Sequence, residues 1–139
     1  MTQKPRLVLG FDYGRKRIGV AIGQALTGTA TPLTTIRCPH QRPDWQVITR
    51  LIETWHPDAL VVGEPSAPPG VTHPIAQAAR RFGNQLRGRY ALPVYWIDER
   101  LSSHAAERAL QDNGRRVDEA VDSVAARIIL ETWLSQQSP

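Results

Sequence analysis

Acidic side chains end several apolar runs of this sequence. These acids are Asp12, Glu64 and the pair Asp98 and Glu99, which follow the runs 7–11, 59–63 and 94–97, respectively. Burying a carboxylate is costly unless it is paired or binds a metal ion, so acids in these positions need a chemical explanation. If the three runs are parallel strands, the acids lie at the carboxyl edge of one sheet, where open α/β sheets bind ligands.

A further acid, Asp122, begins an apolar helical face near the C-terminus. Ala125, Ala126 and Ile129 follow it at offsets of three, four and seven residues, which is the spacing of one face of a helix. This face is expected to pack on the sheet, and the two small alanines would let the helix come close. Asp122 is therefore expected to point at the same sheet edge as the other acids.

Convergence of these carboxylates would predict a divalent metal site. Carboxylates repel one another, and Mg²⁺ and Mn²⁺ are hard cations that prefer oxygen ligands. Two such ions about 3.5–4 Å apart stabilise both the attacking and the leaving oxygen of a phosphodiester displacement. The alternative is that each acid is only a turn residue or a helix cap.

A basic turn directly follows Asp12. It contains Gly14, Arg15, Lys16 and Arg17, and it would lie beside the acids, where it could bind phosphate groups. The alternative is a solvated hairpin tip with scattered charge. An Asp-x-Gly turn between strands also occurs in actin-like and sugar-kinase ATPases, but 139 residues are too few for the two lobes of those enzymes.

The hydrophobic pattern predicts the element order βββαβαβαα. Strands are expected over residues 6–12, 17–23, 29–37, 59–63 and 93–98, and helices from 43–44 to 56, over 74–90, from 102–103 to 111, and over 117–134. A meander of three strands followed by helix-linked strands predicts one α/β domain over residues 1–139, with a mixed sheet covered by helices. The 74–90 helix has an arginine-rich outer face formed by Arg80, Arg81 and Arg87, and Trp96 could serve either the core or base stacking.

Composition narrows the class of protein. The chain has 139 residues, of which 41% are hydrophobic, as in one globular domain. It has no signal peptide pattern and no run approaching the roughly 18 apolar residues of a membrane span. A single cysteine, Cys38, leaves a reducing, cytoplasmic setting as the default; four scattered histidines suggest no zinc site. Of 17 basic residues, 15 are arginine, and the planar guanidinium group, which binds phosphate, favours a phosphate-rich partner. The net charge of +4 is modest, and the alternative is a merely soluble basic domain.

Four ordered blocks of sequence together resemble one known family. They are Gly10-Phe11-Asp12-Tyr13-Gly14 with residues 17–21, Pro57-Asp58 leading into residues 61–63, Asp98-Glu99-Arg100-Leu101-Ser102-Ser103, and Asp122-Ser123-Val124-Ala125-Ala126 with residues 128–130. The sequence is similar to the YqgF (RuvX-like) family of pre-16S ribosomal RNA nucleases, also described as Holliday-junction-resolvase-like. The resemblance implies an RNase H-like fold, with a five-stranded mixed sheet of order 3-2-1-4-5. It implies Asp12, Glu99 and Asp122 as the catalytic acids, and Glu64 departs from an apolar family position.

These observations lead to the hypothesis of a cytoplasmic, metal-dependent nuclease in ribosome biogenesis that matures the 5′ end of 16S ribosomal RNA. Asp12, Glu99 and Asp122 would bind Mg²⁺ or Mn²⁺, with Asp98 and Glu64 in support. The cations expected to bind phosphate groups of the nucleic acid are Arg15, Lys16, Arg17 and Arg100. Two alternatives stay open: a DNA nuclease that resolves four-way junctions, usually as a dimer, and a non-catalytic RNA-binding assembly factor. The sequence leaves the choice between monomer and homodimer open, and it predicts no membrane association.

Overall fold

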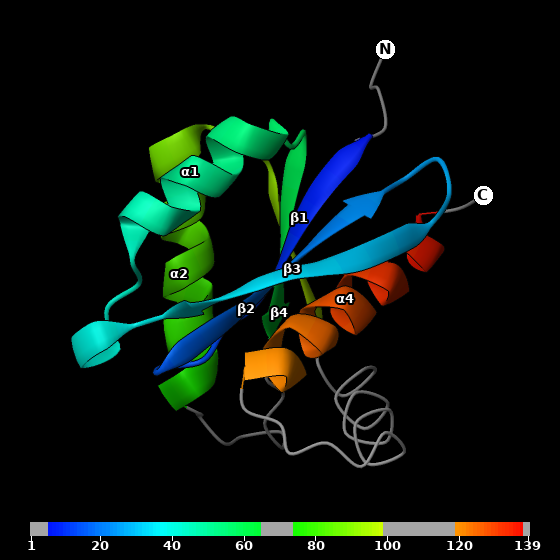
Figure 1. Ribbon diagram of the computed structural model, residues 1–139. Helices are drawn as coiled ribbons and strands as arrows, with labels where there is room; N and C mark the ends of the chain where they lie inside the picture. The colour runs from blue at the N-terminus through cyan, green and yellow to red at the C-terminus, as the bar shows by residue number, and fades with distance from the viewer. Residues whose placement is uncertain (1–5, 65–73, 99–118, 138–139) are drawn as a thin grey trace.

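Five strands form one mixed sheet in the computed structural model, which describes residues 6–64, 74–98 and 119–137 (Figure 1). The strands are β1 (Leu7–Asp12), β2 (Arg17–Gln24), β3 (Thr29–Arg37), β4 (Ala59–Glu64) and β5 (Val94–Asp98). Their order is β3-β2-β1-β4-β5. β2 is antiparallel to β1 and β3, whereas β4 is parallel to both β1 and β5. The predicted strand order and the parallel arrangement of the three acid-bearing strands are confirmed.

Helices cover both faces of the sheet. α1 (Trp45–Trp55) and α2 (Pro74–Tyr90) lie on one face, and α4 (Glu119–Gln136) lies on the other (Figure 1). A single 3₁₀ turn, η1 (Pro39–Gln41), precedes α1. The helix expected from residue 102 or 103 to 111 lies outside the described residues. None of the described helices is long and apolar enough to cross a membrane.

Local sequence explains the limits of α1. The Asp44 side chain accepts a hydrogen bond from the Val47 backbone N–H at 3.4 Å and so caps the helix start. His56 adopts a left-handed backbone conformation and donates its N–H to the Ile52 carbonyl, which ends the helix.

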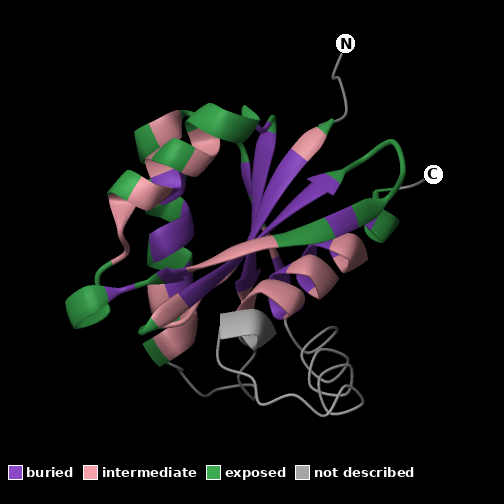
Figure 2. Cartoon of the chain, viewed as in Figure 1, coloured by how far each residue is buried: buried purple, intermediate pink, exposed green. Residues whose placement is uncertain are grey.

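The alternation of side chains along each strand divides the core in two. Leu9 and Phe11 of β1 join the core beneath α1 and α2, whereas Val8 joins the core beneath α4. The buried residues run through the sheet and line the inner sides of the helices (Figure 2). Because side chains alternate with a period of two, Asp12 lies on the α4 face, as Val8 does.

Glycines allow α4 to lie unusually close to the sheet. A Cβ atom on Gly10 would lie 3.1 Å from the Leu130 Cβ, and one on Gly23 would lie 2.8 Å from the Leu130 Cδ2. A Cβ on Gly19 would overlap the backbone carbonyl of Asp122 and lie 2.9 Å from the Ser123 nitrogen. Backbone contact at Gly19 therefore fixes the height of Asp122 above β2.

Candidate active site

Asp12 and Asp122 stand side by side on the α4 face of the sheet. Gly19 is the cross-strand partner of Asp12, and such partners have Cα atoms about 4.5–5.5 Å apart with their side chains on one face. Since the Cβ position of Gly19 falls on the backbone of Asp122, both acids lie above the same point of the sheet. The structure thus brings together two acids that are 110 positions apart in the numbering.

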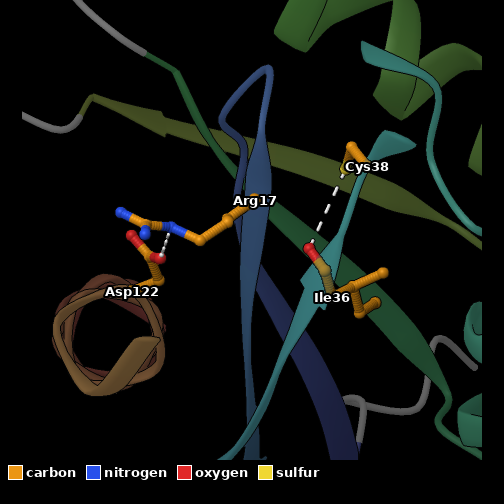
Figure 3. A network of polar contacts seen from close by, with 4 residues as sticks. All are labelled: Arg17, Ile36, Cys38 and Asp122. Atoms are coloured by element: carbon orange, nitrogen blue, oxygen red, sulfur yellow. Dashed lines mark hydrogen bonds and ion pairs between the residues drawn. The ribbon is translucent and has the colours of Figure 1, made fainter. Parts of the chain in front are cut away.

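Arg17 forms an ion pair with Asp122. Its Nε lies 2.9 Å from the Oδ2 of Asp122, with exposed side-chain fractions of 41% for Arg17 and 19% for Asp122 (Figure 3). The guanidinium reaches from the start of β2 across to the first turns of α4. It offsets negative charge on a mostly buried carboxylate, which would otherwise be costly to desolvate.

A hollow of about 410 Å³ opens beside this ion pair. It is lined by the β1–β2 turn, the beginning of α2 and Asp122; the residues are Gly14, Arg15, Lys16, Arg17, Pro74, Ile75 and Asp122. Three predicted phosphate-binding cations therefore line one recess with a predicted metal ligand. A recess with cations on one wall and a carboxylate on another could hold a phosphodiester group.

Glu64 and Asp98 lie at the same carboxyl edge but on the opposite face of the sheet. They are register partners at the ends of β4 and β5, and alternation from Leu60 and Val62 puts Glu64 on the α2 face. There its Oε1 accepts a hydrogen bond from Arg80 Nη2 at 2.7 Å.

Within the described segments, no group of three or more acidic, histidine or cysteine side chains could hold a metal ion.

Two predicted site residues, Glu99 and Arg100, lie outside the described residues. The described part of the chain therefore contains two of the three acids that the family resemblance implies as catalytic, Asp12 and Asp122. Sequence reasoning did not identify the partnership of Arg80 with Glu64, nor the place of Pro74 and Ile75 in the wall of the hollow. Strand alternation was the available signal, because it places Glu64 on the face that the 74–90 helix covers.

Cys38 is buried away from this hollow and is not a nucleophile at neutral pH. Its Sγ donates a weak hydrogen bond to the Ile36 carbonyl at 3.9 Å (Figure 3). Burial, with a smaller contribution from the negative charge of Asp44, raises the pKa of the Cys38 thiol to about 11. The thiol therefore stays protonated near pH 7.

This sheet order, with helices on both faces, is an RNase H-like fold of the kind found in RuvC. The chain is similar to a Thermus thermophilus RuvC solved in complex with a Holliday junction substrate (TM-score 0.59, 18% identity, 94% of each chain covered). It is also similar to the fowlpox virus Holliday junction resolvase (TM-score 0.58, 12% identity, 95% of this chain and 99% of the other covered). At these identities the likeness shows the fold alone.

The family follows from sequence. Residues 6–136 match the family model RuvX, described as Holliday junction resolvase, and the chain belongs to this family. A relative in Nitrosococcus oceani is 49% identical over 138 residues, covering 96% of this chain and 90% of its own. One in Burkholderia ambifaria is 50% identical over 134 residues, covering 94% and 90%. Both carry the name "Putative pre-16S rRNA nuclease".

Proposed function

We propose that this chain is a metal-dependent nuclease that hydrolyses phosphodiester bonds during 5′-end maturation of pre-16S ribosomal RNA in the cytoplasm. One observation carries the proposal: Asp122 is held over Gly19 opposite Asp12, on the wall of a hollow lined by Arg15, Lys16 and Arg17. The names of the relatives that match nearly the whole chain support the choice of substrate.

The donor set suits a hard divalent cation. Asp12 and Asp122 would supply carboxylate oxygens on the same face of the sheet. Glu99 would be the third ligand, because the block Asp98-Glu99-Arg100-Leu101-Ser102-Ser103 resembles an acidic block of the family. When bound there, Mg²⁺ or Mn²⁺ would supply Lewis-acid activation of water and neutralise charge at the attacked phosphate. Glu64 and Asp98, expected to support the metal, face α2, so the proposal gives them no direct ligand role.

The cations around the hollow have separate tasks. Arg15 and Lys16 are exposed in the β1–β2 turn and would hold the phosphates on either side of the cleaved bond, because both side chains reach the hollow. Arg17 offsets the charge of Asp122 and would keep that carboxylate oriented. Arg100 stays a proposed phosphate-binding residue on the strength of the sequence block that contains it.

The test is a cleavage assay with a matched acid variant. Wild type, Asp12→Asn and Glu53→Gln are compared on a precursor 16S RNA fragment in Mn²⁺ and in chelator. Glu53 is an exposed acid on α1 and serves as the control. Asp12→Asn should lose about 100-fold or more of the metal-dependent rate while keeping its fold and its affinity for the RNA. Full cleavage by Asp12→Asn would contradict the assignment.

A second candidate is a DNA nuclease that resolves four-way junctions. The family description names this activity, and the T. thermophilus RuvC with a similar fold was solved with such a substrate. The same assay on a four-way DNA junction separates the two. Symmetric cleavage of the junction by a dimer, with intact precursor RNA, would favour the resolvase. RNA binding without cleavage of either substrate would favour an assembly factor.

A further inference from the structure

The exposed polar side chains of α2 are all cationic or amide groups. The helix contains four arginines and no acid between residues 74 and 90. Its exposed polar residues are Gln77, Arg80, Arg81, Asn84, Gln85, Arg87 and Arg89. The proposed catalytic function uses only the first turn of α2, where Pro74 and Ile75 line the hollow, so the arginine-rich surface is left without a role.

Two of these arginines lie over the indole of Trp96. The Arg80 and Arg87 guanidinium carbons lie 5.4 Å and 5.5 Å from the ring centroid. Gly83, between them on the helix, makes room for the indole, because a Cβ there would lie 2.5 Å from Trp96 Cζ2. Trp96 belongs to β5, the last strand in the sheet order. The indole therefore sits under α2 and holds one arginine on the turn before Gly83 and one on the turn after it.

Stacking on the indole rings fixes the orientation of these arginines in a way that favours phosphate binding. A guanidinium held over a ring has a fixed plane, and the N–H groups at its edge can donate to phosphate oxygens. In Arg80, Nη2 already donates to Glu64 Oε1, which leaves the other N–H groups of that guanidinium for a phosphate. Arg89 is held in the same way, 4.1 Å from the centroid of the Trp45 ring. Because rotamer freedom is already restricted, less conformational entropy is lost when a ligand binds.

This surface is continuous with the candidate active site. Burial raises the pKa of Tyr13, whereas the positive charges of Arg15 in the basic turn and Arg81 in α2 lower it. Both arginines therefore lie near Tyr13. Tyr13 packs on Phe82 of α2, with ring centroids 5.2 Å apart. With about 1.5 Å of rise per residue, Arg87 lies about 18 Å along the helix axis from Ile75 at the hollow. A polyanion leaving the hollow could therefore follow α2 over several nucleotides.

A nucleic acid backbone suits this surface better than a second copy of the chain. Two α2 helices facing each other would bring like charges together, since neither offers an acid to its partner. The planar cations along the helix can instead donate to phosphate oxygens of a polyanion, which carries no positive charge to repel them. We propose that the α2 surface, defined as Arg80, Arg81, Arg87 and Arg89 with Trp45 and Trp96 beneath them, binds the phosphodiester backbone of the substrate RNA outside the cleaved bond. This inference rests on the proposed nuclease function.

The test uses the salt dependence of binding. Affinity is measured in chelator, to prevent cleavage, with a fluorescent RNA hairpin carrying a single-stranded 5′ extension. Arg87→Gln is compared with Arg127→Gln, which removes the same charge from α4 on the opposite face of the sheet. Loss of one phosphate contact should make the negative slope of log K against log[salt] less steep by about 0.7–0.9. It should also weaken binding about three- to tenfold. Arg127→Gln should change the slope by less than half as much.

A second variant separates preorganisation from charge. Trp96→Leu keeps every arginine but removes the ring, so the slope should stay at the wild-type value while affinity falls about two- to fivefold. Trp96→Phe should recover part of the loss. The thermal unfolding of each variant is recorded, so that a fall in affinity with an unchanged melting curve reports binding alone. An unchanged affinity in Trp96→Leu would overturn the role given to stacking.

The outcomes distinguish the two proposals. If the wild type cuts RNA but Arg87→Gln and Arg127→Gln have equal slopes and affinities, the α2 surface is wrongly assigned and the nuclease stands. If the wild type neither cuts nor binds RNA, the proposed function is wrong, and the inference about the α2 surface is wrong with it. If Arg87→Gln instead changes a dimer into a monomer without altering RNA affinity, the surface belongs to a second copy, which also overturns the inference.

Discussion

Replacing Gly19 by alanine should displace α4 from the sheet and disable the candidate site. The new Cβ would overlap the Asp122 carbonyl and lie 2.9 Å from the Ser123 nitrogen, and both obstacles are backbone that no side-chain rotation can clear. An ordinary contact begins at 3.4 Å, so the start of α4 must move away from β2 by more than about 1 Å. A gap of that size removes about a quarter to a half of the dispersion energy of each contact that it opens.

The cost can be estimated from the packing of α4. Ala126, Ile129 and Leu130 of this helix are buried against the sheet, and overpacking at such an interface costs about 3 kcal/mol. For a chain of this size that corresponds to a fall in Tm of roughly 10 °C. Because Asp122 moves with the helix, metal-dependent cleavage should fall about 100-fold. Thermal unfolding and the RNA cleavage assay measure the two effects.

Gly88→Ala is the matched control. A Cβ at Gly88 meets nothing within 4 Å, on the exposed side of α2. Alanine is the better helix former, so this variant should gain about 0.5–1 kcal/mol and keep full activity. If Gly19→Ala unfolds at the wild-type temperature and cleaves at the wild-type rate, the close contact between β2 and α4 does not position Asp122, and the reasoning is refuted.

Three further outcomes are expected. Glu64→Gln and Asp98→Asn should retain metal-dependent cleavage, since both acids lie on the α2 face, whereas Glu99→Gln should lose it; equal losses in all three would refute this division, and cleavage rates measure it. Cys38 should resist alkylation at pH 7–8, because its thiol is protonated there. The raised pKa of Cys38 should add to the free energy of unfolding below pH 9.0, and this contribution should be lost as the pH approaches 11. The free energy of unfolding of Cys38→Ala, subtracted from that of the wild type at each pH, isolates the contribution. Asp44→Ala should cost about 1 kcal/mol by removing the cap of α1, and an unchanged denaturant midpoint would show that the 3.4 Å contact contributes nothing.

Much of the fold followed from local patterns in the sequence. The apolar runs before Asp12 and Glu64 predicted β1 and β4 to within a residue, and the 74–90 pattern predicted α2 with its observed limits. These elements were predictable because short-range preferences agree with the final packing: continuous apolar runs become strands buried on both faces, and a 3.6-residue period becomes a helix with one buried side. The strand order came from the family resemblance.

The sequence predicted which acids lie at the carboxyl edge of the sheet, but not on which face of the sheet each one lies. Sequence placed Asp12, Glu64 and Asp98 at the carboxyl ends of parallel strands, and the sheet confirms those positions. It grouped them as one cluster. The structure divides them, because consecutive residues of a strand face opposite sides and the register of each strand decides which side its last residue takes.

The sequence alone thus determined the α/β class, the elements and the residues with the right chemistry, since these depend on side-chain type and short-range periodicity. Only the tertiary structure decided which of those residues meet. Asp122 pairs with Arg17 and lies over the cross-strand partner of Asp12 because glycine at position 19 admits the helix backbone. Glu64 meets Arg80 because α2 covers the other face. Contacts between residues far apart in the chain depend on register and on the distance between layers, which local sequence does not specify.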